Sequence, residues 1–467
     1  MSGPSSASRD KSSGPQLAKG SLGWMTLAAL GVSYVVAGDY AAWNYGFASA
    51  GWGGMVAAFG LMAVMYLCLA FCLAELASAI PTAGGGYAFA RCAFGPAAGF
   101  LTGFCVALEY VAATGAIGIF LTSYFEALTG MGGLGPLLCF YALFLGLHLL
   151  GVGEALRLLF LFALIAILGI LTFAWNSFPA FSAAHLTAAA GPVPAGLLPF
   201  GLTGIWSALP FGIAFFLAVE GVALASEEAR DPARAIPRAL LTAWGILGAL
   251  ALIILVAAPG ATGIGPLLNS DSPLIDAMRA PGANLPTLPR TIVNLCGLIA
   301  LAASFFSIMY AFSRQIFSLS RAGYLPAFLA RTNRRHSPWL ALLLPGALAF
   351  TASATASGEV LIVTAVFCAT TSYLIMLAAF IRLRRTAPSM PRPYRTPGGM
   401  ATAGLALILA FAAFAACLSA TLLWSGVAAC GLVAALAYFW FYSRHHLVAD
   451  APEEEFALIA TADGEVR

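Results

Sequence analysis

Charge is what this sequence has least of. Only 9% of its 467 residues are Asp, Glu, Lys or Arg, whereas 61% are hydrophobic. A soluble domain carries about 25% charged residues, and a soluble core of this length would not bury so much apolar surface. The net charge is only +3 and no basic stripe accompanies it, which argues against a nucleic-acid partner. We therefore expect a polytopic membrane protein.

Patterns for metal, redox or hydrolytic chemistry are also missing. Nine Cys are scattered along the chain without the spacing of a zinc site or a disulfide framework. The five His form no metal-ligand pattern, and the glycine run 84–86 lacks the Lys-Ser/Thr of a phosphate-binding loop. No Ser/His/Asp set lies inside the apolar runs. We expect no enzymatic activity, no metal and no cofactor.

What the sequence does contain is long apolar runs. A bilayer-spanning helix needs about 20 mostly apolar residues, and a β-barrel would instead show ten-residue alternation. The sequence therefore predicts an all-α protein with twelve transmembrane helices. The predicted spans are 22–49, 53–79, 96–127, 134–150, 154–176, 204–226, 238–259, 290–318, 339–357, 359–383, 400–420 and 423–443.

The basic residues indicate the orientation. If the N-terminus is cytoplasmic, 20 of the 22 Lys and Arg fall on the cytoplasmic side, and only Arg279 and Arg290 fall outside. An error of one span in the count would place basic residues on both sides of the membrane. The separation therefore supports twelve spans, with both termini in the cytoplasm. Residues 1–20 and the acidic segment 446–467 are predicted to be solvated tails. The Arg-rich, Ala-rich composition favours a bacterial inner membrane.

Three acids lie near the middle of predicted spans: Asp39, Glu109 and Glu220. At 1.5 Å per residue, each is roughly 20–25 Å into its span. An acid at that depth costs about 2.5–3.5 kcal/mol, and no Lys or Arg lies at comparable depth in any span. Each acid must therefore be protonated, face water, or pair with a cation that arrives from outside.

Two of these acids adjoin a glycine at the same depth. Gly38 precedes Asp39 in the first span, and Gly221 follows Glu220 in the sixth. Glycine favours interruption of a helix, and helices five spans apart cross the membrane in opposite directions. This predicts a five-plus-five inverted repeat with discontinuous helices one and six; the alternative is two unrelated glycine kinks. The predicted units are 21–176, 177–386 and two peripheral helices in 387–445.

Aromatic residues accompany the acids. Carboxylates combined with aromatic faces suit an ammonium ion, although a single aromatic more often packs or faces lipid. The predicted substrate-binding residues are Gly38, Asp39, Tyr40, Trp43, Tyr110, Phe216, Glu220 and Gly221.

Several motifs resemble the amino acid–polyamine–organocation superfamily over about residues 20–445. They are Pro81-Thr82-Ala83-Gly84-Gly85-Gly86-Tyr87, Glu227-Glu228-Ala229-Arg230-Asp231-Pro232 and Arg321-Ala322-Gly323-Tyr324-Leu325-Pro326. The resemblance implies ten core helices in two inverted repeats plus two peripheral helices. Residues 38–46 and 215–222 resemble the ethanolamine permease branch, which implies uptake of a small amino alcohol.

The resemblance also bears on the charge of the substrate. Amino-acid members have a Gly-Ser-Gly type loop at the first break, whose backbone N–H groups hold the substrate carboxylate. Here Asp39 aligns with the second glycine, where a carboxylate would repel that group and suit a cation. Ethanolamine is therefore the first expectation. The alternatives are an amino-acid or polyamine permease of the same fold, and a membrane receptor that binds an amine without moving it.

The coupling ion is less defined. Proton-coupled members with a basic residue in helix five would need one near Ala166, and residues 158–175 contain no Lys or Arg. Glu109 becomes the candidate proton carrier because of its depth. Ser304 and Ser307 in the eighth span are candidates for a sodium site, although Ser there more often packs helices. A uniporter remains an alternative.

Overall fold

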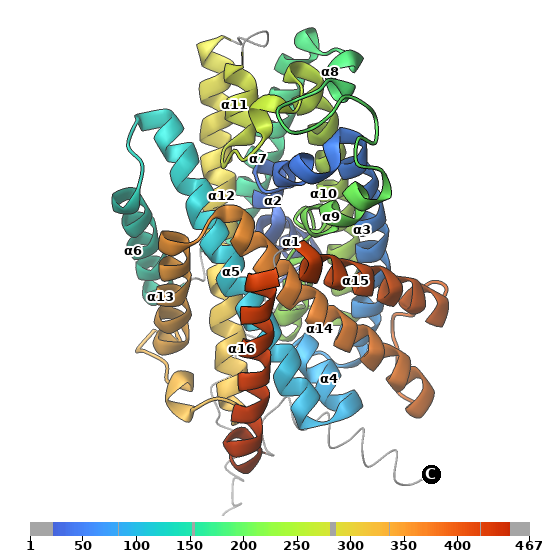
Figure 1. Cartoon of the computed structure of the whole chain (residues 1–467). Helices are drawn as coiled ribbons and strands as arrows, with labels where there is room; N and C mark the ends of the chain where they lie inside the picture. The colour runs from blue at the N-terminus through green and yellow to red at the C-terminus, as the bar shows by residue number, and fades with distance from the viewer. Residues whose placement is uncertain are drawn as a thin grey trace, which may run out of the picture.

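The computed structural model describes residues 22–82, 84–151, 155–280, 286–335, 337–420 and 422–448. Within these ranges the chain is helical, and no named β-strand occurs (Figure 1). The predicted tail 1–20 and nearly all of the tail 446–467 lie outside the described residues.

Eight helices in the described ranges are long and apolar enough to cross a bilayer. They are α3 (Gly46–Ala79), α5 (Pro96–Thr129), α7 (Ala155–Ser177), α10 (Pro232–Thr262), α12 (Thr287–Arg321), α14 (Gly358–Thr386), α15 (Met400–Ala420) and α16 (Leu422–Phe441). Four shorter apolar helices are α1 (Trp24–Val35), α6 (Leu134–Leu150), α9 (Gly201–Ile213) and α13 (Trp339–Thr355). Each of the twelve predicted spans corresponds to one of these helices.

Short elements complete the described chain. They are α2 (Ala37–Tyr40), η1 (Trp43–Tyr45), α4 (Gly86–Phe94), η2 (Phe178–Ala180), α8 (Ala183–Thr187), η3 (Val219–Glu228), η4 (Gly265–Leu267), α11 (Pro273–Arg279), η5 (Ala327–Ala330) and η6 (Ser443–His445). In Figure 1, α4 lies at the lower end of the bundle, whereas α8 and α11 lie at the upper end.

Helices one and six are discontinuous, as the paired acids predict. Helix one consists of α1, a turn at Val36, the single turn α2, and then a non-helical pair in which Ala42 has φ 84°. Helix six is α9, followed by turns over 214–218 in which Ala218 has φ 73°, and then the 3-10 helix η3.

The breaks were expected near residues 37–40 and 217–222. Ala218 lies within the second range, and the non-helical residues 36 and 41–42 flank the first. Gly38 and Gly221 themselves lie inside α2 and η3. The left-handed residues are two alanines, and such a conformation costs of order 1–3 kcal/mol per residue unless the surroundings impose it. Ala42 and Ala218 are both fully buried, so the packing around them imposes this conformation.

The two glycines instead allow neighbouring groups to pack closely against the backbone. A Cβ atom on Gly38 would lie 2.1 Å from the carbonyl oxygen of Ala214. A Cβ atom on Gly221 would lie 3.1 Å from Cε2 of Tyr34 and 3.3 Å from the hydroxyl of Tyr110. Gly38 therefore lets the backbones of helices one and six touch directly at their interruptions.

The core and the periphery differ in burial. In the most apolar stretch of α5, 78% of residues are buried, against 17% in that of α16. α5 packs against α12 and α14, whereas α15 covers α14 and α3 from outside. The exposed apolar side chains of α15 and α16 suit contact with lipid. The last two helices are thus peripheral, while the boundaries of the two inverted repeats remain a prediction.

Candidate functional site

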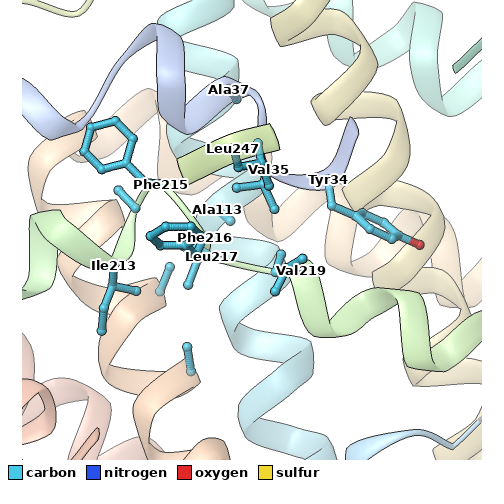
Figure 2. Packing of buried hydrophobic residues seen from close by; sticks show 14 of the residues in the cluster. Tyr34, Val35, Ala37, Ala113, Ile213, Phe215, Phe216, Leu217, Val219 and Leu247 are labelled. Atoms are coloured by element: carbon cyan, nitrogen blue, oxygen red, sulfur yellow. The ribbon is translucent and has the colours of Figure 1, made fainter. Parts of the chain in front are cut away.

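A small cavity lies where the interruptions of helices one and six meet. It has a volume of about 20 Å³, slightly more than one water molecule needs. None of its lining side chains is charged. They are Tyr34, Val35, Ala37, Gly38, Ala42, Ala113, Ile117, Phe120, Ala214, Leu217, Ile308 and Ile362. Figure 2 shows side chains of both broken helices gathered there, with Ala113 of α5 among them.

Side chains from neighbouring helices stabilise the break in helix one. An interrupted helix leaves backbone groups without intrahelical partners, and burying them unpaired is costly. The backbone N–H of Ala37 donates to Oγ of Ser304 on α12 at 3.1 Å. The hydroxyl of Tyr124 on α5 donates to the carbonyl oxygen of Tyr40 at 2.9 Å. The break is therefore built into the helix packing.

Two predicted site residues, Tyr40 and Trp43, have structural contacts. The Tyr40 hydroxyl donates to the carbonyl oxygen of Ala166 at 2.7 Å, at the place in helix five where a base was sought. The indole N–H of Trp43 donates to the carbonyl oxygen of Asp39 at 3.2 Å, and its ring stacks on Phe215. Neither side chain lines the cavity, so both hold the break in place.

Asp39 is fully buried beside this cavity. Its neighbour Gly38 lines the cavity, whereas the Asp39 side chain is not among the lining groups. No described donor forms a hydrogen bond to either of its carboxyl oxygens. Asp39 therefore has the property that the sequence indicated, an acid inside the membrane without a described partner.

Glu109 and Glu220 form a pair. Glu109 on α5 is fully buried and Glu220 on η3 is 5% exposed. Their carboxyl groups are neighbours, because both contact the hydroxyl of one residue, Tyr373. The Tyr373 hydroxyl oxygen on α14 lies 2.9 Å from Oε2 of Glu220 and 3.4 Å from Oε1 of Glu109. The pair therefore joins helices three, six and ten.

Two more tyrosines surround this pair. The Tyr66 hydroxyl lies 3.0 Å from the Tyr373 hydroxyl, and the Tyr110 hydroxyl donates to Oε1 of Glu220 at 3.4 Å. Carboxylates only accept hydrogen bonds, so a hydrogen bond between the two carboxyl groups would require a proton on one of them. Two ionised carboxylates in contact with the same hydroxyl would repel, so this arrangement favours a proton on at least one of them.

A second, smaller cavity lies next to Glu220 on the α4 side of the bundle. Its volume is about 10 Å³, room for about one water molecule at most. It is lined by Leu73, Gly86, Phe89, Val106, Tyr110, Glu220, Ala223, Leu224 and Met376. Along α5, Ala113 lines the first cavity and Val106 the second, with Glu109 between them. Glu220 thus faces the second cavity, and Glu109 lies between the two cavities.

The remaining predicted residues are placed as follows. Phe216 packs among the rings of Phe59, Tyr66 and Trp244 and does not line the first cavity. The Ser307 hydroxyl donates within its own helix to the carbonyl oxygen of Ala303 at 2.7 Å. The sodium role of Ser304 and Ser307 remains a prediction.

Sequence reasoning missed four side chains at this site. Tyr34 and Phe120 line the first cavity, and Tyr66 and Tyr373 contact each other beside the acid pair. For the three tyrosines the available signal was a hydroxyl inside a predicted span, which needs a partner in hydrocarbon. Glu220 shares the Tyr373 hydroxyl with Glu109, and no described hydrogen bond joins Glu220 to Asp39.

Comparison with known proteins identifies the family. The amino acid permease family model matches residues 22–442. The chain is 32% identical over 342 residues to an uncharacterized transporter of Rhizobium meliloti, covering 69% of this chain and 70% of that one. It is 24% identical over 462 residues to a branched-chain amino acid permease of Bacillus subtilis, covering 93% and 95%. A methylthioribose transporter of Bacillus subtilis is 24% identical over 402 residues, covering 78% and 79%.

A solved structure shows the same fold. It is a mutant of the manganese transporter of Eremococcus coleocola, with a TM-score of 0.59 and 14% identity, covering 94% of each chain. At that identity the likeness concerns the fold alone. The transporter relatives favour transport over the receptor that the sequence left open. The chain therefore belongs to the amino acid permease family of the amino acid–polyamine–organocation superfamily, and is a multi-pass membrane transporter and not an enzyme.

Proposed function

We propose that this transporter imports a small cationic amine, with ethanolamine as the first candidate, across a bacterial inner membrane. Its termini would lie in the cytoplasm, as the distribution of basic residues favours. The observation that carries the proposal is Asp39, a fully buried acid whose two carboxyl oxygens have no described hydrogen-bond donor. An isolated buried carboxylate is strongly unfavourable, and an ammonium group would supply the missing charge and donors.

The ends of the broken helices support a cationic substrate. The carboxyl-terminal end of a helix carries a partial negative charge. The cavity is lined by Val35, the last residue of α1, and by Ala214, which follows the last residue of α9. The negative ends of two helices thus meet at one cavity, beside Asp39. The apolar lining suits the short carbon chain of ethanolamine.

Transport requires movement. At about 20 Å³ the cavity is too small for a substrate of several heavy atoms. The helices around it must separate for binding, and closure on alternate sides would then be a rocking of one helix bundle against the other. This supports alternating access.

A second candidate is a zwitterionic amino acid with an apolar side chain. Ile117, Ile308 and Ile362 line the cavity, and one relative is named as a branched-chain amino acid permease. In that case Asp39 would have to be protonated, since a carboxylate there would repel the substrate carboxylate.

A substrate panel in proteoliposomes tests the proposal. Uptake of ethanolamine, choline, putrescine, alanine and arginine is compared for the parent, Asp39→Asn and Asp231→Asn. Loss of a buried charge partner costs about 2 kcal/mol or more, so Asp39→Asn should lower ethanolamine uptake about 30-fold or more. Asp231 is 54% exposed, and its variant should transport like the parent.

The opposite results are equally informative. Ethanolamine uptake that is unchanged in Asp39→Asn would exclude the ammonium site at this acid. Saturable alanine uptake with no ethanolamine uptake would establish the second candidate.

A further inference from the structure

We propose that the Glu109–Glu220 pair is the binding site of a coupling proton, and that Glu220 exchanges this proton with the predicted cytoplasmic side. The inference rests on the transport function and is independent of which amine is carried. It adds Glu220 and Tyr373 to a role for which the sequence suggested Glu109 alone.

The acid pair connects two helices. Glu109 belongs to α5 and Glu220 to η3, the segment that follows the break in helix six. Glu220 lies two residues after Ala218, the left-handed residue of that break. The protonation state of the pair is therefore linked by direct contacts to the shape of helix six.

Proton release would change the charge of the pair. When the shared proton leaves, the O–H bond of one carboxyl group breaks and the proton passes to water in the second cavity. Two neighbouring carboxylates then face each other in an apolar region and repel. The single proton of the Tyr373 hydroxyl bonds only one carboxylate at a time. Release therefore pushes η3 away from α5 and α14.

The two acids differ in their access to water. Glu220 and Tyr110 line the second cavity on the α4 side, whereas Glu109 does not. Oε2 of Glu109 also accepts no hydrogen bond from a described N–H or hydroxyl group. Glu220 is therefore the member of the pair that meets water, and Glu109 is the buried member that shares its proton.

The surroundings leave the pair without a fixed positive charge. The titratable groups that face it are Tyr34 of α1, Tyr66 of α3, Cys105 and Tyr110 of α5, and Cys368 and Tyr373 of α14. None of these described groups is basic. A proton is thus the cation that compensates the second carboxyl group in this state.

Proteoliposome uptake with and without an inward proton gradient tests the proposal. The substrate is whichever amine or amino acid the parent carries. The gradient should accelerate uptake by the parent and by Glu126→Gln, a control on the same helix α5. It should have no effect on Glu109→Gln or Glu220→Gln, while substrate counterflow, which needs no net proton movement, persists in both.

If a Gln variant fails in counterflow, Glu220→Asp is tested instead. It keeps a titratable group on a shorter side chain, so it should retain part of the acceleration by the gradient. If the proton gradient does not change the rate of uptake by the parent, the proposal is wrong. Equal acceleration in the parent and in both Gln variants also overturns it.

Infrared spectroscopy gives a readout that needs no substrate. At neutral pH, the carbonyl stretch of a protonated carboxyl group should be present in the parent and weaker in both Glu109→Gln and Glu220→Gln. Asp39→Asn is the control that identifies any contribution of the third buried acid to this band. A band that is unchanged in both Gln variants would contradict a shared proton, whatever the substrate is.

Discussion

A buried acid at the end of the bundle has fixed cationic partners, whereas the buried acids at its middle have none among the described residues. Glu75, near the end of α3, is 1% exposed and lies between two arginines. Arg384 bonds both of its carboxyl oxygens at 2.9 and 2.5 Å, and Arg392 lies 3.2 Å away. The backbone N–H of Thr396 donates to Glu75 at 2.7 Å. This acid has a complete set of fixed partners.

Asp39, Glu109 and Glu220 have no such cation. Asp39 has no described hydrogen-bond donor, and the two glutamates accept hydrogen bonds from tyrosine hydroxyls. Buried charge is stable only when it is paired. Where the protein supplies the cation, the acid ties helix two to helix ten and to the segment that follows it. Where it does not, the positive charge must come from a mobile ion, which is what a transporter binds and releases.

The largest effect on stability is expected at the fixed pair. Glu75→Gln leaves Arg384 and Arg392 partly buried without their anion, and breaking a buried pair costs about 3–5 kcal/mol. Thermal unfolding in detergent should show a clearly lowered Tm. Glu220→Gln, at an acid without a fixed cation, should lower Tm much less. Equal losses for the two variants would remove the distinction between the regions.

A smaller effect is expected from the packing of the middle region. Gly38→Ala places a Cβ atom 2.1 Å from the backbone oxygen of Ala214, so the two breaks must separate. Overpacking of this kind costs about 1–3 kcal/mol. Gly60→Ala is the matched control, because a Cβ atom there meets nothing within 4 Å. The measurement is Tm together with uptake, and a fully active Gly38→Ala would show that the contact is dispensable.

The smallest effect is expected at Tyr373. Tyr373→Phe removes one hydroxyl from the acid pair and leaves both carboxyl groups, at a cost of about 1 kcal/mol. Uptake should persist while its dependence on external pH shifts, since the shared proton loses a donor that stabilises the ionised partner. A pH profile identical to that of the parent would mean that the hydroxyl is only a packing contact.

The spans were predictable because the thickness of the bilayer's hydrocarbon core sets the length and hydropathy of a spanning helix. The turn between the first two spans was expected at 50–52, and Gly51 breaks the helix there with φ 67°. The exact breaks at Ala42 and Ala218 were not predictable, since alanine carries no local signal for a left-handed backbone. Glycine at 38 was read as a flexible point, whereas its role depends on a backbone 176 residues away in the sequence.

The candidate site was predictable only in part. The depth of Asp39, Glu109 and Glu220 singled them out, because charge is rare in these spans. The pairing of the acids depends on how α5, α14 and η3 pack. Because Asp39 and Glu220 lie at equal depth in their spans, the sequence suggested that these two are partners, whereas Glu220 lies beside Glu109. Tyr373 contributes from a helix 153 residues further along the chain than Glu220.

The bare contact between Gly38 and Ala214 has a mechanical consequence. No side chain lies between the two backbones, so no side-chain rearrangement can compensate for a displacement of one of them. A shift of η3 that begins at the acid pair would be transmitted through the turns 214–218 to α2 with little loss. The two interruptions then behave as a single shared pivot, so a force applied at Glu220 moves the backbone beside Asp39.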